Sequence, residues 1–569
     1  MSQFAVACLI LNRAIGSGIF IQPFNVLFQI ESTGIALLIW VVAGLVVLVL
    51  MLCWVEMALS VPRYLVRGVM RPIISSGGDG LYLQHLYSRP RFLITCIFGI
   101  TQLVFGNLGA EAIQFGISMQ TLIDPGCAEG QPCYSRYKVV GWGLGAVCVC
   151  AISAAMLRLR GGRYLPDVNV LFALVKVIFL VTTAITGIAY GTMHGNQCQR
   201  ISWQAGSDKG NSAGDISLAV LLATYAYAGF EQPFYVLADI KHPRRIAKSA
   251  TTAVLILVVL FPLVNLGYMC AAPDLQNPTE RNVVIAIYRV LGPEDSMTAE
   301  RVISAVLAVF ILGSILAQTF TSAPVIFDIV KGGILSFPLS SRLAPPLFRT
   351  LKTLRVPLPI PWSRPTILTI GATVLFSAFS ILGISLVGFS VSRPSASYVY
   401  LSLLRTLGIT GILGFLLAAG LVYQKIRKPY LHRFSILIRW HRLKWLSPKM
   451  TKNLKPFLDP LPVVCATVAL GFLVIAVFVG PQKTLEGAAL PYWAIPLLAW
   501  AVPLSGVAWW FGLLCTELYK HKVLTVKKTL FVVARDDGTA VVADELVEPS
   551  WIPRQDHNSF VAEMTDHIA

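Results

Sequence analysis

Apolar runs long enough to cross a lipid bilayer recur along the whole chain, and they constrain the fold more than any other feature. A bilayer core about 30 Å thick needs about 20 apolar residues at the helical rise of about 1.5 Å per residue. With 56% hydrophobic residues, 13% charged residues and a mean hydropathy of +0.70, the 569-residue chain cannot present a soluble surface. We therefore predict an all-α integral membrane protein.

About twelve transmembrane helices are predicted when each apolar run is measured against the length of a span. The final polar stretch has no run long enough to cross, and it carries the turn signal Asp537-Gly538 between β-rich segments. The expected spans are Phe4–Gln29, Gly34–Met57, Phe92–Ile123, Val139–Met156, Asp167–Tyr190, Ile216–Leu237, Thr251–Ala271, Val302–Phe327, Pro365–Val391, Val399–Tyr423, Val463–Val479 and Pro491–Leu514.

Charge indicates how these spans are oriented. The net charge of +18 could indicate nucleic-acid binding, but the basic residues lie in short segments between apolar runs, which is typical of cytoplasmic loops. They follow every second span, so we predict an even span count, both termini in the cytoplasm and no nucleic-acid partner. A cleavable signal is not expected at the N-terminus. The basic segments are 63–91, 158–163, 241–248, 331–364, 425–455 and 520–528.

Two spans contain residues that interrupt helices. The first carries N-R-A-I-G-S-G-I-F, with Gly16 and Gly18 in the middle of an apolar run. The sixth carries T-Y-A-Y-A-G-F-E-Q-P, with Gly229 and Pro233 at similar depth. Glycine costs about 1 kcal/mol in a helix interior and proline about 3 kcal/mol. We therefore predict a break in each of these two spans.

In an intact helix the backbone N–H and C=O groups bond to one another, whereas a break at membrane depth leaves some of them available to a ligand. The N–H groups at the start of a half-helix carry partial positive charge and suit a carboxylate, while freed carbonyl groups suit an ammonium group. A zwitterion fits both. The alternative is that these glycines only permit close packing of neighbouring helices.

Within the predicted spans a charge is costly and marks a functional candidate, and the three glutamates and Lys176 draw attention for this reason. Burial favours the neutral form of an amine, so Lys176 could exchange a proton, although it could also extend to an interface. Glu231 lies at the sixth-span break and could support its backbone or a proton path. Glu111 could add a proton site or stay neutral. We expect Glu56 to pair with Arg63 or a neighbouring loop.

The sequence gives little support for a metal site, a catalytic site or a channel filter. Most cysteines lie in apolar runs, where cysteine acts as a small hydrophobe. Cys127 and Cys133 share a polar outside loop, and a disulfide between them is left open. No zinc or haem spacing, nucleophile elbow or phosphate-binding loop is found, so no cofactor and no enzymatic activity are expected. A channel is disfavoured because no repeated filter loop is found.

The motifs, taken together, resemble those of the amino acid–polyamine–organocation superfamily, in particular the fungal permeases grouped with L-type transporters and high-affinity methionine permeases. The similarity extends from the first residues to W-I-P near Trp551. The motifs that carry it are N-R-A-I-G-S-G-I-F (Asn12 to Phe20), S-G-G-D-G-L-Y-L (Ser76 to Leu83), R-G-G-R-Y-L (Arg160 to Leu165) and Y-A-Y-A-G-F-E-Q-P-F-Y-V-L (Tyr225 to Leu237).

The resemblance implies two inverted five-helix repeats, as in the bacterial leucine transporter, followed by two extra helices. The transmembrane permease domain would be 1–515, with repeats at about 4–190 and 216–423, extra helices at 463–514 and a cytoplasmic tail at 516–569. The implied substrate-binding residues are Ile15, Gly16, Ser17, Gly18, Tyr225, Ala226, Tyr227, Gly229 and Phe230.

Within that set, the backbone of Gly16 to Gly18 would meet the substrate carboxylate, and carbonyl groups near Ile15 and Tyr225–Tyr227 would meet its amino group. Tyr225 would close over the substrate and Phe230 would line the side-chain pocket, whereas ordinary helix packing is the alternative for both aromatics. Lys176 looks like the lysine that stands in place of sodium in sodium-independent relatives. Glu111 stands where the fungal relatives carry an amide.

The implied function is transport of amino acids, neutral and methionine-like, by alternating access with proton coupling across the plasma membrane. The coupling candidates are Lys176, Glu231 and Glu111. A polyamine or organic-cation transporter is the alternative, because Glu111 and Glu231 could bind a cation. A nutrient sensor with weak transport also stays open. The sequence identifies no protein partner.

Overall fold

The structure is a computed structural model of the chain. It describes residues 1–60, 63–66, 69–72, 75–127, 129, 131, 133–159, 164–193, 201–203, 211–271, 283–284, 296–331, 364–391, 393–427, 460–481, 491–534 and 540–553. Much of the basic segments 331–364 and 425–455, the residues R-G-G-R at 160–163 and the turn signal Asp537-Gly538 lie outside these residues.

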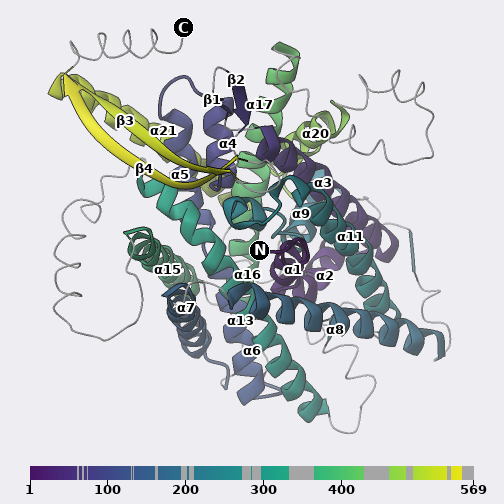
Figure 1. The fold of residues 1–569 in the computed structure, drawn as a ribbon. Coiled ribbons are helices and arrows are strands. Elements are labelled where there is room, and N and C mark those ends of the chain that lie inside the picture. The colour runs from purple at the N-terminus through teal and green to yellow at the C-terminus, as the bar shows by residue number, and fades with distance from the viewer. Residues whose placement is uncertain are drawn as a thin grey trace, which may run out of the picture.

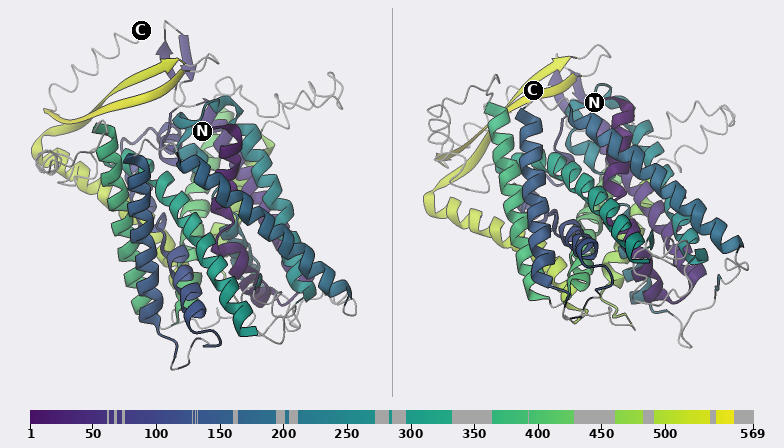
Figure 2. Two further views of the ribbon diagram at one scale, coloured as in Figure 1. Left: turned by 60° about the horizontal axis from the view of Figure 1, so that its bottom comes forward. Right: turned by 90° about the horizontal axis from the view of Figure 1, so that it is seen from below.

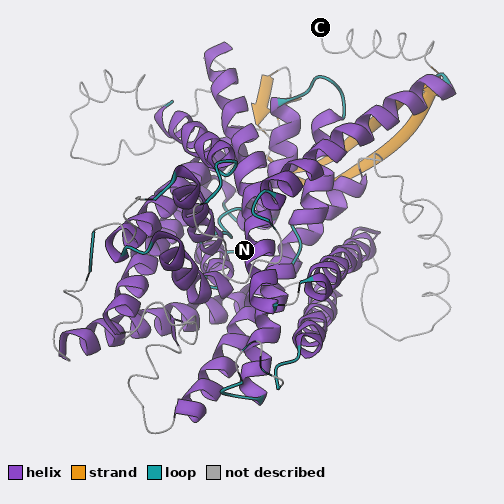
Figure 3. Cartoon of the chain, turned by 180° about the vertical axis from the view of Figure 1, so that it is seen from behind, coloured by secondary structure: helices purple, strands orange, loops and turns teal. Residues whose placement is uncertain are grey.

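Helices make up almost all of the described chain, and strands are limited to two pairs (Figure 3). The helices of the first half are α1 (Gln3–Ala14), α2 (Ser17–Ile30), α3 (Thr33–Ser60), α4 (Gly78–Leu86), α5 (Leu93–Phe105), α6 (Gly109–Ile123), α7 (Arg136–Leu159) and α8 (Leu165–Met193). Those of the second half are α9 (Ala213–Ala226), α10 (Gln232–Tyr235), η2 (Leu237–Asp239), η3 (Pro243–Arg245), α11 (Ile246–Ala271), α13 (Ser296–Lys331), α15 (Arg364–Ser390), α16 (Pro394–Arg405), η7 (Thr406–Leu413), α17 (Gly414–Arg427), α20 (Leu461–Ala476) and α21 (Ala494–Lys520).

The number of spans agrees with the prediction. Within the described ranges, nine helices are long and apolar enough to cross a membrane, and the bent pair α1 and α2 makes a tenth span. The shorter apolar helices α9 and α20 occupy the two remaining predicted positions, so each of the twelve predicted spans contains a helix. The all-α integral membrane fold is confirmed.

The outer surface of the bundle is apolar, as lipid contact requires. On α8, Ile178 and Ile185 are 65% and 63% exposed, although both are large hydrophobic residues. In contrast, Ala173 and Leu180 on the same helix are fully buried. A helix that is apolar on all sides suits a span with one face on protein and the other on lipid.

The first span lies inside the bundle. Helix α1 packs on α8, α11 and α13, and α2 packs on α9, so both halves of this span are surrounded by other helices near the middle of Figure 1. Nearly every residue from Cys8 to Phe20 is buried. The residues that interrupt the first span therefore lie in the interior of the bundle.

Among the described residues three spans are interrupted, and the sequence predicted two of these breaks. The first bends by 45° between α1 and α2. The sixth ends as α9 at Ala226 and resumes as α10 at Gln232. The third, predicted as the span Phe92–Ile123, contains a break between α5 and α6 at Gly106–Leu108. The predicted span is confirmed, since Leu93–Ile123 as a whole is long and apolar enough to cross a membrane. Within it, Gly106 ends α5 and the N–H of Gly109 donates to the Asn107 side chain at 2.7 Å.

The strands lie outside the bundle. β1 (Arg63–Val66) pairs antiparallel with β2 (Val69–Pro72), and β3 (Lys522–Ala534) pairs antiparallel with β4 (Ala540–Pro553). β3 and β4 flank the position of the predicted turn in the tail. In Figure 2 both strand pairs and the N-terminus lie at the same end of the bundle. This placement is the one expected for an even number of spans.

Candidate functional site

The break in the first span exposes the N-terminus of a half-helix in the protein interior. Helix α1 ends at Ala14, α2 begins at Ser17, and the N-cap Gly16 provides no side-chain hydrogen bond. The N–H groups of the first turn of α2 therefore depend on other partners, and together they carry partial positive charge. Ser17 and Gly18 are buried in this turn.

The break in the sixth span meets the break in the first. Gly229 has φ +130°, a backbone conformation that side chains rarely adopt, and a Cβ atom there would lie 2.8 Å from Cγ of Arg13. Its N–H donates to a carboxylate oxygen of Glu231 at 2.8 Å. Glu231 thus supports the non-helical backbone, one of the two roles considered for it from sequence.

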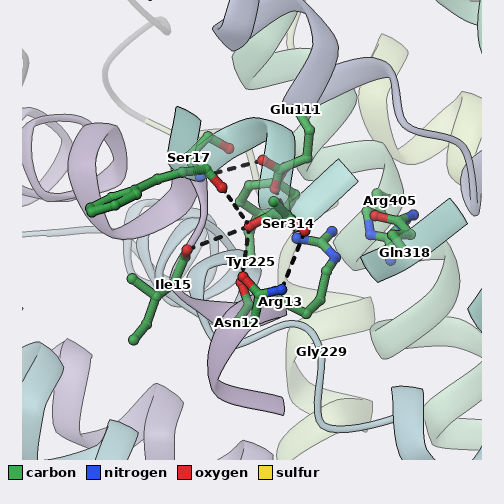
Figure 4. Close-up of polar contacts among 12 residues, drawn as sticks. Asn12, Arg13, Ile15, Ser17, Glu111, Tyr225, Gly229, Ser314, Gln318 and Arg405 are labelled. Atoms are coloured by element: carbon green, nitrogen blue, oxygen red, sulfur yellow. Dashed lines mark hydrogen bonds and ion pairs between the residues drawn. The ribbon is translucent and has the colours of Figure 1, made fainter. Parts of the chain in front are cut away.

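Two buried ion pairs lie beside these breaks, and Figure 4 labels both members of the first, Arg13 and Glu111. Arg13 Nη1 lies 2.9 Å from Glu111 Oε1, and both side chains are only 3% exposed. Arg405 Nη2 lies 3.6 Å from Glu231 Oε1. Removing one member of a buried ion pair leaves an uncompensated charge in the protein interior, which is strongly destabilising. Each of these arginines is therefore needed by its glutamate.

Glu111 makes two further contacts at the first break. The N–H of Ser17 donates to Glu111 Oε2 at 3.3 Å, and the hydroxyl of Tyr225 donates to Oε1 at 3.2 Å. A Cβ atom at Gly16 would lie 3.2 Å from both carboxylate oxygens, so the missing side chain of Gly16 makes room for them. The Glu111 carboxylate therefore caps the N-terminus of α2.

The break in the third span provides carbonyl groups that other helices bind. Gln318 on α13 donates to the Gly106 carbonyl at 3.0 Å, and Arg405 at the end of α16 donates to the Asn107 carbonyl at 3.3 Å. Glu111 lies in the first turn of α6, directly after this break. The third span thus positions Glu111 against the first, and Arg405 connects its break to Glu231.

Lys176 is fully buried, at 0% exposure, on α8. Its Nζ donates to the Asn12 carbonyl at 2.8 Å and to Ser314 Oγ at 2.8 Å, so it joins α8 to α1 and α13. The alternative reading, in which Lys176 extends to the membrane interface, is wrong. The amine lies in the bundle interior, at the last helical turn before the first break.

The aromatic residues expected at the site have separate surroundings. Tyr225 lies at the first break, and its ring contacts that of Tyr398, whose hydroxyl bonds to Ser17 Oγ at 3.3 Å. Tyr227 instead donates its hydroxyl to the Trp40 carbonyl at 2.9 Å. The ring of Phe230 packs edge-on against Trp54, with centroids 5.6 Å apart. In this structure the rings of Tyr227 and Phe230 take part in helix packing, which is the alternative considered for Phe230.

Gly18 has a packing role of its own. A Cβ atom there would lie 2.6 Å from the Cα of Ala226, so α2 and α9 approach closely at this point. Both readings of the first-span glycines therefore apply within one motif: Gly16 makes room for a carboxylate, and Gly18 permits helix contact. Gly18 and Ala226 contribute here by packing.

Three remaining sequence features can be placed. Glu56 pairs with Lys425 at 2.8 Å, so its partner is at the end of α17, whereas we had expected Arg63 or a neighbouring loop. Cys127 and Cys133 are joined by a disulfide. Asp79, in the S-G-G-D motif on α4, accepts hydrogen bonds from Trp54 Nε1 and from the Tyr235 hydroxyl.

Arg13 and Arg405 were missed as site residues. The available signal was simple, because each is an arginine inside or at the edge of an apolar span, where a charge marks a functional candidate. Two glycines in F-G-N-L-G would similarly have indicated the third break.

The chain matches the protein-family model described as amino acid permease over residues 1–502. It is similar to the high-affinity methionine permease of Saccharomyces cerevisiae, with 23% identity over 58% of this chain and 54% of that protein. It is similar to the b(0,+)-type amino acid transporter 1 of Mus musculus, with 26% identity over 59% of this chain and 65% of that protein.

A third relative is the human large neutral amino acids transporter small subunit 2, with 22% identity over 58% of this chain and 57% of that protein. The matched regions thus span roughly half to two thirds of the length of these relatives. All three names describe permeases or transporters and none describes an enzyme, in agreement with the expectation from sequence. Because the family model covers most of the chain and the described helices form a membrane bundle with an interrupted first span, this protein belongs to the amino acid permease family.

Proposed function

We propose that this protein transports amino acids, neutral and methionine-like, across a membrane by alternating access. The observation that carries the proposal is the meeting of two interrupted helices around the buried N-terminus of α2, where Gly229 lies against Arg13. A half-helix N-terminus beside an arginine suits a carboxylate, and the Ile15 carbonyl at the end of α1 suits an ammonium group.

The substrate class is also supported by the relatives. Their names describe a methionine permease, a b(0,+)-type amino acid transporter and a large neutral amino acids transporter. Broken helices that meet in the bundle interior are typical of carriers that rearrange around a fixed site. We therefore place medium to large neutral amino acids first among the substrates to test.

The polyamine alternative has less support. A dication would need unpaired acidic groups, yet the two candidates, Glu111 and Glu231, lie 2.9 Å and 3.6 Å from arginine partners. Their charges are already balanced in the bundle interior. A cation would have to separate a buried ion pair in order to bind.

Lys176 is our candidate for proton coupling. Its amine donates to the Asn12 carbonyl, which belongs to the last turn of α1 before the break. A change in the charge of Lys176 would therefore act directly on the backbone that leads into the site. We further propose that the protein lies in the plasma membrane with both termini in the cytoplasm.

The test of this function is uptake of a radiolabelled amino acid panel, including methionine, leucine and phenylalanine, into proteoliposomes. Buffer at pH 5 and at pH 7.5 is used outside, and spermidine is added as a competitor. We expect saturable methionine uptake that is faster with acid outside and unaffected by spermidine. Uptake of spermidine in place of amino acids would contradict the proposal.

The role of Lys176 is tested with Lys176→Met, which keeps the length of the side chain and removes its charge and donors. We expect uptake to lose its acceleration by external acid, because the buried amine can no longer gain or lose a proton. Lys425→Met is the matched control, since Lys425 pairs with Glu56 away from the breaks. An unchanged acid acceleration in Lys176→Met would exclude Lys176 from coupling.

A further inference from the structure

The Glu111 carboxylate is bound by donors from two other helices and by the break itself (Figure 4). Arg13 Nη1 lies at 2.9 Å, the Tyr225 hydroxyl at 3.2 Å and the Ser17 N–H at 3.3 Å. Glu111 is only 3% exposed, so water contributes little to holding it. Its two oxygens thus have the surroundings that a small carboxylate ligand would need.

The position of this carboxylate is that of a ligand at a half-helix N-terminus. It lies over Gly16 and accepts from the first N–H of α2, a helix of 14 residues. Backbone N–H groups at such a terminus bind anions, because no intrahelical acceptor satisfies them. The α-carboxylate of an amino acid bound at the first break would require the same donors.

Arg13 gives an independent indication that a second acceptor binds here. Only Nη1 of its guanidinium contacts Glu111, while Nε and Nη2 have no hydrogen-bond partner within the described part of the chain. The side chain is only 3% exposed. A buried guanidinium with two unused donors is costly, and a carboxylate that receives two parallel N–H bonds would satisfy both.

We propose that Glu111 is an internal ligand of the first break, and that a carboxylate substrate binds by displacing it from the N-terminus of α2. This proposal rests on the proposed transport of amino acids and adds a residue that competes with them. The free donors of Arg13 allow the exchange, since the guanidinium can hold one carboxylate at Nη1 and another at Nε and Nη2. Occupancy by Glu111 thus lowers the apparent affinity for every substrate that carries a carboxylate.

The first experiment tests the subsite without any transport measurement. In Glu111→Ala, the donors around Gly16 lose their carboxylate, so added acetate should bind in its place. We expect acetate to raise the melting temperature of the purified variant by about 2 °C in a saturable way, and to leave the unmodified protein unchanged. Sodium chloride at equal ionic strength and ethylamine hydrochloride are the controls for salt and for cations.

An acetate effect of equal size in both proteins, or in neither, would overturn the proposal. If Glu111→Ala does not fold, Glu111→Gln carries the test, because its amide keeps the shape and accepts hydrogen bonds more weakly than a carboxylate. We expect the half-saturation concentration for methionine uptake to fall about tenfold in Glu111→Gln, equivalent to the loss of one charge-assisted hydrogen bond. Glu56→Gln, which changes a buried and paired glutamate elsewhere, should leave that concentration unchanged.

The outcomes separate this inference from the proposed function. Methionine uptake by the unmodified protein, with the same half-saturation concentration in Glu111→Gln, would support transport and exclude Glu111 as a competitor. Acetate binding by Glu111→Ala without amino acid uptake in any protein would support the internal ligand and contradict the proposed substrate.

Discussion

At the scale of single residues, the buried charges are the feature that most distinguishes this protein. Arg13, Glu111, Glu231 and Arg405 form two ion pairs at the interrupted helices, and Lys176 lies close to them with neutral partners. Buried ion pairs contribute little to stability when compared with apolar residues of similar volume, but breaking one is costly. Their location at the breaks, and not along the lipid-facing helices, indicates a functional role.

The Arg13–Glu111 pair gives the first prediction at this scale. Arg13→Gln should destabilise the protein by about 3 kcal/mol or more, because it leaves a buried carboxylate without its counter-charge. The double variant Arg13→Gln with Glu111→Gln should recover much of that loss, since neither charge is left unpaired. Thermal unfolding of the four proteins in detergent measures the coupling. Additive losses in the double variant would contradict a direct interaction.

Asp79 gives a prediction on pH. It lies on α4, a nine-residue helix between two spans, and burial raises the pKa of its carboxyl from 3.8 to about 7. Between pH 3.8 and about pH 7 the Asp79 carboxyl is protonated in the folded protein and ionised in the unfolded chain. The contribution of Asp79 to the free energy of unfolding therefore falls as the pH rises through that range. We expect Asp79→Asn to raise the melting temperature relative to the unmodified protein more at pH 8 than at pH 5. A difference independent of pH would contradict the assignment.

At the scale of helices, sequence reasoning predicted two of the three breaks. Gly16 and Gly229 were found because glycine is costly in a helix, and both breaks occur where predicted. The break at Gly106–Leu108 was missed because the run Phe92–Ile123 contains no proline, and the signal for a break is limited to Gly106, Asn107 and Gly109. The surroundings of Tyr227 and Phe230 could not be predicted, since they depend on which neighbouring helix each side chain faces, which no local pattern encodes.

The sixth-span break gives the prediction at this scale. Gly229→Ala should abolish uptake, because an alanine at φ +130° is strained by about 1–3 kcal/mol and its Cβ would press on Arg13. Gly141→Ala on α7 is the matched control, since a Cβ atom there meets nothing within 4 Å. Comparison of uptake at equal membrane levels tests the prediction. Equal uptake by the two variants would show that the strained conformation is dispensable.

At the scale of the whole molecule, hydrophobicity predicted the fold well. All twelve predicted spans contain helices. Bilayer thickness fixes the length of a span, and in lipid the backbone N–H and C=O groups must bond to one another, as they do in a helix. The division into inverted repeats stays a prediction. The site was predicted only in part, since Arg13 and Arg405 were overlooked and the partner of Glu56 comes from a distant helix.

Orientation can be tested with two single substitutions. Ala205→Asn creates the glycosylation signal Asn-Gly-Ser at 205–207, in the loop after the fifth span, and Asp537→Asn creates Asn-Gly-Thr at 537–539 in the tail. With both termini in the cytoplasm, only Ala205→Asn should gain a glycan when expressed in yeast. Electrophoretic mobility before and after glycosidase treatment shows which variant carries a glycan. A glycan on Asp537→Asn alone would show that the termini lie outside the cytoplasm.

The tenth span contains a π-helical segment that affects its rotation about its own axis. Between α16 and α17 the chain forms the π-helix η7 over eight residues, directly after Arg405. A π-turn accommodates one more residue than an α-turn, so it behaves as an insertion absorbed within a continuous helix. The π-helix therefore helps to set how Arg405 is rotated relative to α17, and Arg405 contacts both the Asn107 carbonyl and Glu231. The angular setting of the tenth span, and with it the position of its arginine, thus depends on the wider winding of residues Thr406–Leu413.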